Sequence, residues 1–229
     1  MQTISKKLNH IETGNRLTIY SALAEALNYP SQELAVGLKS GDFARQLSHA
    51  LQALELNNLS DQLSDLGNEY TELPQSAEDI RLALEKEYTW MCFASKPRLV
   101  YLFESVYREG KLLQESTFDI ARLYYEAGLK MDENFQLPPD HIAVEMEFMA
   151  YLCHNELEAR QQGDKEKEDY AGALQKTVLD NHLAAFACQF AEKLGLYAES
   201  DFYKTMAWII TALFREFSEA SKTKEEKSC

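Results

Sequence analysis

The five histidines of this 229-residue chain are the side chains best suited to metal or acid–base chemistry. A di-iron site in a helical bundle needs a Glu-x-x-His motif on each of two helices. The residues three positions before the histidines are not acidic, namely Lys7, Gln46, Pro138, Tyr151 and Leu179. His141 and Glu145 are spaced to share one face of a helix, where they could ligate a metal. Because no third ligand accompanies them, a helical metal-dependent enzyme is a minor alternative.

The cysteines do not form a recognisable reactive site either. Four are present without a Cys-x-x-Cys motif, and Cys92, Cys153 and Cys188 lie in apolar stretches. Such residues are typical of buried thiols in a protein from a reducing compartment. The sequence also lacks a Gly-rich phosphate loop and a Gly-x-Ser-x-Gly elbow. We therefore predict that the protein is not an enzyme and that it carries no metal or cofactor.

The elements that position these residues are predicted to be helices. Only 9 glycines and 5 prolines occur in the chain, which implies few turns and long elements. Leucine and alanine dominate the apolar residues, and this bias favours helix over sheet. We predict an all-α fold with one compact domain of about eight to eleven helices over residues 1–218. Residues 219–229 form a charged tail that is predicted to be disordered.

Local signals place the individual helices. Ser31 begins one helix, and Ser76 begins another with Asp79 in a capping box. Ser116 is the predicted N-cap of a helix that ends at Gly128. The apolar spacing predicts helices over residues 15–27, 31–41, 43–54, 59–66, 76–91, 118–127, 141–160, 170–194 and 200–219.

Three segments lie between these helices. Residues 93–110 lack a clear period and are predicted to form a structured loop or a short helix. Residues 161–169 are charge-rich and fit either a loop or an exposed helix. Residues 130–137 form a polar connector between two helical halves of the chain. This connector is a possible hinge, so we expect a monomer, a domain-swapped homodimer, or both.

Charge and hydropathy restrict the location and the partners. No uncharged apolar run approaches the length that crosses a bilayer, and the first residues lack the apolar region of a secretory signal. The net charge of −14 repels nucleic acid phosphates and anionic lipids. We expect a cytoplasmic protein that binds no nucleic acid and does not insert stably into a membrane. A basic partner would be attracted.

One run of residues is unusually specific for a helical protein. Pro138-Pro139-Asp140-His141 precedes the longest predicted helix. Asp140 is suited to cap that helix, because a short acidic side chain accepts amide hydrogen bonds at a helix N-terminus. A cap role alone would make Asp140→Asn nearly neutral, whereas pairing with a partner's arginine would make the same change costly for binding. Both roles stay open at this stage.

Several runs together resemble a known family. They are Glu104-Ser105-Val106-Tyr107, Tyr125 to Leu129, and Pro138 to Met149, with weaker echoes at Glu87-Tyr88-Thr89, His182-Leu183 and Phe202-Tyr203. This pattern resembles the TorD/DmsD/NarJ-like redox-enzyme maturation proteins over roughly residues 15–217. The chain departs from the family pattern at Met91-Cys92, where Leu-Phe is common. It also lacks the acidic residue that often precedes the Asp-His run.

The resemblance implies a TorD-like all-helical cytoplasmic chaperone for molybdoenzyme assembly. Such a chaperone binds the twin-arginine signal peptide and the apo form of a molybdopterin oxidoreductase of the DMSO/TMAO reductase type. It assists cofactor insertion and proofreads the precursor before export. The expected partner is therefore a molybdopterin-dependent oxidoreductase precursor. A generic helical scaffold or regulatory binding module is the alternative.

A twin-arginine peptide needs carboxylates beside an apolar surface. Asp140 and Glu145 supply the carboxylates, and aromatic side chains could supply the walls. The predicted client or signal-peptide contacts are Asp140, His141, Glu145, Pro139, Tyr107, Ser105, Tyr88 and Phe148.

Overall fold

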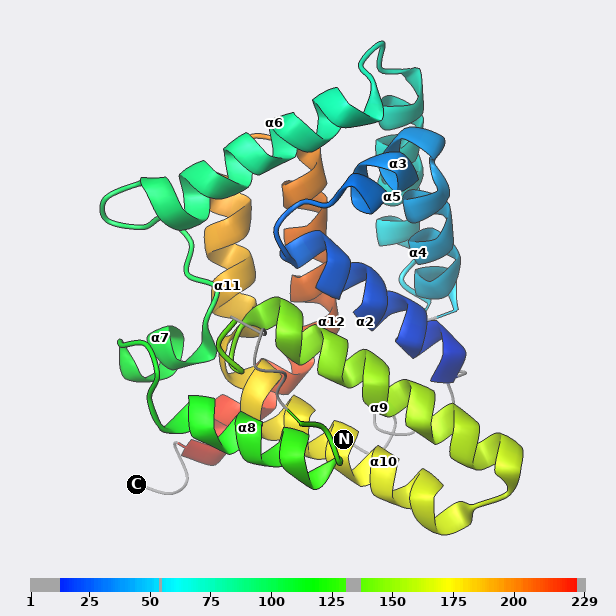
Figure 1. Ribbon diagram of the computed structural model, residues 1–229, viewed down its shortest axis with the longest axis vertical. Coiled ribbons are helices and arrows are strands. Elements are labelled where there is room, and N and C mark those ends of the chain that lie inside the picture. The colour runs from blue at the N-terminus through cyan, green and yellow to red at the C-terminus, as the bar shows by residue number, and fades with distance from the viewer. Residues whose placement is uncertain (1–12, 54, 131–136, 226–229) are drawn as a thin grey trace.

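Helices make up most of the computed structural model, which describes residues 13–53, 55–130 and 137–225 (Figure 1). The α-helices are α2 (Thr13–Leu27), α3 (Gln32–Ser40), α4 (Asp42–Gln52), α5 (Asn57–Glu72), α6 (Ala77–Thr89), α7 (Glu104–Glu109), α8 (Glu115–Glu126), α9 (Ile142–Gln162), α10 (Lys165–Val178), α11 (Ala184–Tyr197) and α12 (Asp201–Glu225). Two π-helical turns, η1 (Trp90–Ala94) and η2 (Leu179–Leu183), follow α6 and α10. The described residues contain no β-strand, so the predicted all-α class is confirmed.

Several helix boundaries follow the local signals in the sequence. The Ser31 side chain accepts a hydrogen bond from the Leu34 N–H and caps α3. Ser76 and Asp79 form the predicted capping box at the start of α6. Gly41 ends α3 with φ of 75°, a left-handed conformation that a side chain disfavours. These boundaries are encoded within a few residues, which is why the sequence predicts them.

Other boundaries differ from the sequence-based expectation. The helix expected over residues 170–194 is two helices, α10 and α11, separated by η2. α10 begins earlier because Asp164 caps it, accepting a hydrogen bond from the Lys167 N–H. Ser116 does not cap α8; it lies inside that helix and its hydroxyl donates to the Glu109 carboxylate at 3.0 Å. The segment 93–110 contains the end of η1 and the short helix α7.

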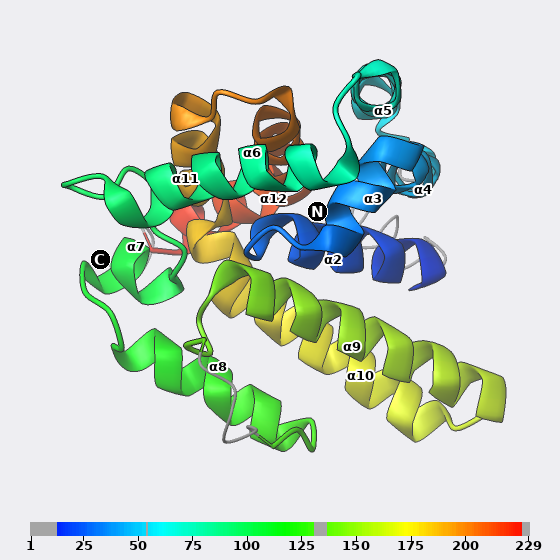
Figure 2. The ribbon, with the colours of Figure 1, turned by 45° about the horizontal axis from the view of Figure 1, so that its top comes forward.

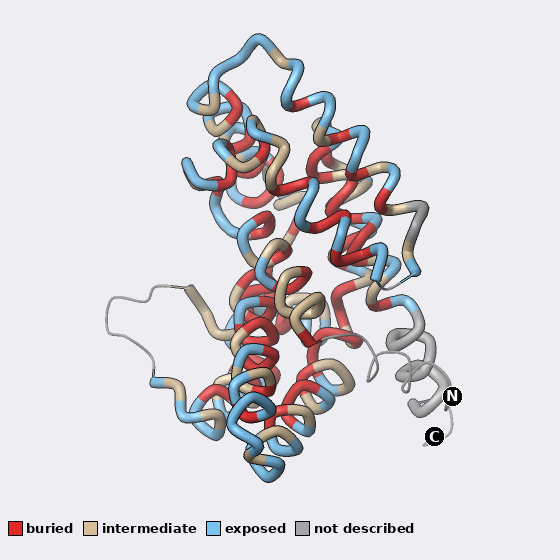
Figure 3. The backbone as a smooth tube through the Cα atoms, turned by 90° about the vertical axis from the view of Figure 1, so that its right-hand side faces the viewer, coloured by how far each residue is buried: buried red, intermediate tan, exposed pale blue. Residues whose placement is uncertain are grey.

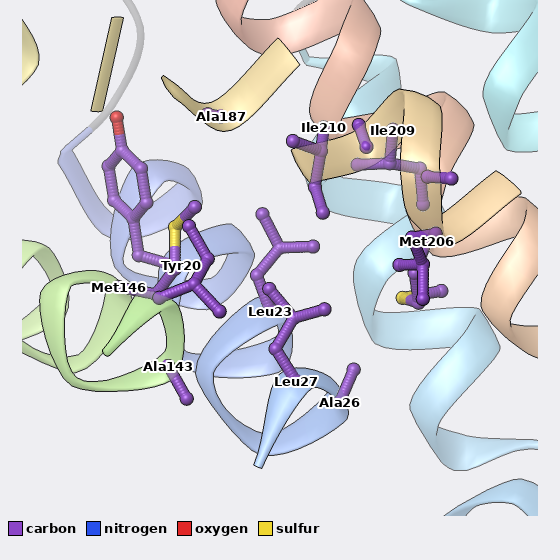
Figure 4. Close-up of a cluster of buried hydrophobic side chains, with 14 of the residues drawn as sticks. Tyr20, Leu23, Ala26, Leu27, Ala143, Met146, Ala187, Met206, Ile209 and Ile210 are labelled. Atoms are coloured by element: carbon purple, nitrogen blue, oxygen red, sulfur yellow. The ribbon is translucent and has the colours of Figure 1, made fainter. Parts of the chain in front are cut away.

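The core forms where helices from both ends of the chain meet. α2 packs along α9, and α11 packs along α12 (Figures 1 and 2). Figure 4 shows Leu23 and Leu27 of α2 among Met146 of α9 and Ile210 of α12. Buried positions follow the inner faces of the helices, whereas exposed positions follow their outer faces (Figure 3). The packing therefore ties the first described helix to α9, which lies more than a hundred residues later in the chain.

Two predicted features fall partly outside the described chain. Residues 131–136, most of the predicted hinge, are not among the described residues. α12 continues to Glu225, beyond residue 219 where the sequence analysis ends it, and residues 226–229 are not described. None of the helices in the described part is long and apolar enough to span a bilayer.

Candidate functional site

Asp140 connects two elements that are far apart in the sequence. Its backbone carbonyl accepts from the Glu104 N–H at 2.9 Å, and its carboxylate Oδ2 accepts from the Ser105 N–H at 3.0 Å. Asp140 therefore caps α7, and the prediction that it caps the following helix is wrong. The cap of α9 is His141, whose Nδ1 accepts from the Ala143 N–H at 3.1 Å. The two adjacent residues thus cap different helices: Asp140 caps α7 and His141 caps α9.

His141 is held in its neutral form. The side chain is buried, and its ring meets the Phe103 ring edge-on at 5.4 Å between centroids. Burial lowers the pKa of His141 to about 4, although the nearby Asp140 carboxylate opposes this effect. At neutral pH the imidazole is therefore a hydrogen-bond acceptor for the helix backbone and not a cation.

Glu145 lies one turn into α9 and is completely buried. Neither of its carboxyl oxygens has a hydrogen-bond partner among the described residues. Burial raises the pKa of Glu145 well above its usual value, and the Glu104 and Asp140 carboxylates raise it further. Ser105, Thr117 and Asp140 each also have a buried oxygen without a partner among the described residues. This part of the interior therefore holds more acceptors and hydroxyls than its own hydrogen bonds use.

The Glu104 carboxylate has more hydrogen-bond partners than the carboxylates of Asp140 and Glu145. Its side chain is 0% exposed, yet it reaches one partner on each oxygen. Oε1 accepts from Arg108 Nη1 at 2.6 Å, and Oε2 lies 2.8 Å from His182 Nδ1. His182 comes from η2, so the π-helical turn brings this ring against α7. We call Glu104, Asp140 and Glu145 the carboxyl cluster.

A groove of about 980 Å³ lies on the outer side of this cluster. It runs between α7, α8, η2 and α11, and α7 and α8 lie together at one side of the molecule (Figures 1 and 2). We call it the α7–α11 groove; its lining residues are Tyr107, Arg108, Glu109, Asp119, Arg122, Leu123, Glu126, Thr177, Asp180, Asn181, His182, Ala184, Ala185 and Gln189. Arg108 and His182 line the groove and also contact Glu104, so they connect the groove with the cluster.

The structure brings most of the predicted contacts into one region. Ser105, Asp140, His141 and Glu145 are all buried there. Pro139 supplies a carbonyl that accepts from the Tyr124 hydroxyl at 2.7 Å. These residues shape the interior beside α7 and do not form an open surface in this conformation.

The predicted aromatic contacts separate into different places. Tyr107 lines the groove, and its hydroxyl donates to the Tyr101 carbonyl at 2.9 Å. Phe148 is buried against Tyr124, with ring centroids 4.5 Å apart. Tyr88 belongs to a separate cluster on α6, where it is buried beside Tyr203. Tyr107 is thus the predicted aromatic contact that faces the groove.

Three residues of the site, Glu104, Arg108 and His182, are not among the contacts that the sequence predicts. Glu104 and Arg108 are spaced i, i+4, a pattern that signals an ion pair on a helix, and His182 stands in one of the runs noted above. His182 reaches Glu104 because η2 interrupts the helices there, and no residue pattern in the sequence predicts this π-helical turn. Within the described residues, no group of three or more His, Cys, Asp or Glu side chains is placed to hold a metal ion.

Comparison with known proteins identifies the family. A family model described as the nitrate reductase delta subunit matches residues 41–192. The chain belongs to this family. The matched region includes every predicted contact as well as Glu104, Arg108 and His182. The carboxyl cluster and all the lining residues of the groove therefore lie inside the family domain.

Individual relatives agree with this assignment. The chain is 28% identical to the chaperone protein TorD of Vibrio parahaemolyticus, over 60% of this chain and 64% of that protein. It is 31% identical to TorD of Photobacterium profundum, over 55% and 61% respectively. A selenate reductase assembly chaperone of Thauera selenatis is 34% identical over 38% and 42%. The alignments thus span less than two thirds of these relatives, which are named as chaperones and not as enzymes, as the sequence predicts.

A solved structure is also similar. It is described as a putative redox enzyme maturation protein from Archaeoglobus fulgidus, with 19% identity and a TM-score of 0.47 over 90% of this chain and 94% of that one. The predicted family resemblance is confirmed by the family match.

Proposed function

We propose that this protein is a cytoplasmic chaperone for the assembly of a molybdopterin oxidoreductase. In this proposal it binds the apo-enzyme precursor and its twin-arginine signal peptide, and it releases them after cofactor insertion. The observation that carries the proposal is membership of the delta-subunit family, together with relatives that are named as assembly chaperones. A client of the DMSO/TMAO reductase type is the finer form of this proposal.

The α7–α11 groove supports the proposal through its charge. Four carboxylates line it, on Glu109, Asp119, Glu126 and Asp180. The chain as a whole carries a net charge of −14, which attracts a cationic peptide from a distance. Paired arginines need carboxylate and carbonyl acceptors at close range, because guanidinium is a fork of five donors without an acceptor. The groove and the adjoining Glu104 offer acceptors of this kind.

The buried residues have a different role in this proposal. Asp140 and His141 set the start of α7 and α9, so they fix the wall of the groove from behind. Tyr107 and the groove carboxylates meet the peptide directly. A buried cap residue can therefore affect client binding without touching the client.

Calorimetry with a twin-arginine signal peptide tests the proposed function. The peptide should bind the full-length protein, and a version with both arginines replaced by lysine should bind at least tenfold more weakly, because lysine cannot form the two-pronged contact. A scrambled peptide of the same charge is the control. Equal affinity for the scrambled peptide would contradict specific recognition and would favour a generic acidic binding module.

Co-expression with candidate precursors identifies the client. A precursor with its own signal peptide should co-purify with the chaperone, and the mature enzyme without that signal should be retained less. Failure of every molybdoenzyme precursor to co-purify, with folded chaperone present, would contradict the proposal.

A further inference from the structure

We infer that Arg108 is an internal occupant of the groove's arginine subsite, and that a client arginine displaces it from Glu104. This inference rests on the proposed function for the identity of the client. The subsite consists of two acceptors, the Glu104 carboxylate and the Asn181 carbonyl. Arg108 Nη1 donates to both, at 2.6 and 2.9 Å respectively.

The contact is needed when the groove is empty. Glu104 is fully buried, and a buried carboxylate without a partner is strongly destabilising. Arg108 satisfies one of its oxygens from the groove side, whereas His182 satisfies the other from η2. Because the same subsite can accept a guanidinium from either source, a client arginine can replace Arg108 without leaving Glu104 unpaired.

The geometry of Arg108 favours exchange. Its side chain is 38% exposed and lines the groove, so it can rotate outwards without unfolding α7. Among the described residues, only its Nη1 atom makes hydrogen bonds. The pair therefore lacks the two parallel bonds of the strongest arginine–carboxylate contacts.

Acidic neighbours can receive the displaced side chain. Glu109 and Asp119 both line the groove, and both are close enough to interact electrostatically with Arg108. Four carboxylates line the groove, against the two guanidinium groups of Arg108 and Arg122. This excess of acidic side chains suits the entry of a further guanidinium.

Arg122 provides a matched control within the same groove. It also lines the groove, but it pairs with Asp119, a partly exposed residue, and not with a buried carboxylate. Arg108→Gln and Arg122→Gln remove the same charge from the same groove. Any change caused by net charge alone should therefore appear in both variants.

The first experiment measures the affinity of these variants for the twin-arginine peptide. If Arg108 occupies the subsite most of the time, its removal should strengthen binding by about tenfold or more, because apparent affinity scales with the competent fraction. Arg122→Gln should change affinity much less, and Glu104→Gln should weaken binding. A gain that is equal in both arginine variants, or a loss in Arg108→Gln, would overturn the inference.

The second experiment needs no client. In Arg108→Ala the Glu104 carboxylate keeps only His182, so methylguanidinium at non-denaturing concentrations should raise the melting temperature of this variant more than that of the wild type. Methylammonium should have a smaller effect. Equal shifts for variant and wild type would show that the subsite does not accept a guanidinium.

The two experiments separate the possible failures. If no form of the protein binds the peptide, the proposed function fails, whereas rescue by methylguanidinium would still support the arginine subsite. If the wild type binds the peptide but Arg108→Gln gives no gain over Arg122→Gln, the proposed function stands and the inference fails. Arg108→Lys is a further check. Because lysine keeps the positive charge beside Glu104, this variant should have a melting temperature between those of Arg108→Ala and the wild type.

Discussion

The three buried carboxyl groups of the carboxyl cluster, on Glu104, Asp140 and Glu145, differ in their hydrogen-bond partners. Glu104 has a guanidinium and an imidazole as partners, and the Asp140 carboxylate accepts the Ser105 N–H with one oxygen. Glu145 has no hydrogen-bond partner among the described residues. Burial of an unpaired carboxylate is unfavourable, and this raises the pKa of Glu145 well above its usual value. At this scale the site combines one hydrogen-bonded carboxyl group, one helix cap and one unpaired acid whose pKa is raised.

Asp140 gives a prediction about stability. Asp140→Ala removes the acceptor for the Ser105 N–H and leaves that buried donor without a partner, which should cost about 1–3 kcal/mol. Asp140→Asn keeps an amide oxygen at the same position and should cost clearly less. Urea unfolding of the two variants measures the difference. Equal stability of the alanine and asparagine variants would contradict the cap role.

Glu145 gives a prediction about pH. Its pKa is raised in the folded state, so above pH 4.5, its ordinary value, the folded protein holds a proton that the unfolded chain releases. The contribution of Glu145 to stability therefore falls as pH rises towards the folded-state pKa. Glu145→Gln cannot release a proton and should be more stable than wild type at pH 8, with an advantage that shrinks towards pH 5.

A matched variant on the same helix controls for charge. Glu147→Gln removes one carboxylate from the exposed side of α9. The test is to measure the unfolding free energies of the wild type, Glu145→Gln and Glu147→Gln between pH 5 and pH 8, and to compare each variant with the wild type. His141 titrates in the opposite sense below pH 6.5, but its contribution is shared by the proteins and cancels in the difference. A constant difference between Glu145→Gln and wild type at every pH would contradict the prediction.

At the scale of elements, contacts between helices decide what local sequence cannot. α4 and α5 approach so closely at Gly67 that a Cβ atom there would lie 2.9 Å from the Ala44 Cβ. Gly67→Ala should therefore push the helices apart and destabilise the protein by about 1–3 kcal/mol. Gly172 of α10 has open space around its Cβ position, so Gly172→Ala should stabilise by about 0.5–1 kcal/mol. Thermal unfolding of both variants tests this, and a stabilised Gly67→Ala would contradict it.

The same distinction explains which parts of the fold and site the sequence predicts. Ser31 and Ser76 mark helix starts because a cap and its target lie within three residues. Asp140 was assigned to the wrong helix because the α7 amide that it accepts from is 35 residues earlier. The break at η2 is a tertiary feature, since it accompanies the contact between His182 and Glu104. Motif spacing therefore identifies residues of the site, but it does not identify their contacts when these come from distant parts of the chain.

At the scale of the molecule, connectivity allows an exchange of helices between two chains. The predicted hinge, residues 130–137, separates α8 from α9, and α9 packs along α2. Exchange of α9 to α12 between two copies would preserve that interface, so monomer and swapped dimer should both exist and interconvert slowly. Light scattering of separated fractions tests this. A single species at all concentrations, without slow interconversion, would contradict it.

Net charge gives the last prediction, which separates attraction from recognition. A chain of net charge −14 attracts any cationic peptide over a distance comparable with the Debye length, about 10 Å at 0.1 M salt. This attraction is the same for a twin-arginine peptide and for its scrambled version. Added salt should therefore weaken both complexes by similar factors. Contacts with buried Glu104 are shielded from salt, so only the twin-arginine peptide retains them.

The decisive quantity is the ratio of the two affinities across a salt series. Recognition at the groove keeps this ratio nearly constant while both affinities fall, because the screened contribution cancels. Recognition by charge alone gives a ratio near one at every salt concentration, because the two peptides carry the same charge. Calorimetry or anisotropy with both peptides measures the ratio, and Glu104→Gln serves as the control: it removes the buried acceptor but changes the net charge by only one unit. In that variant the ratio should fall at every salt concentration, which locates the discrimination at Glu104 and not in the overall field of the protein.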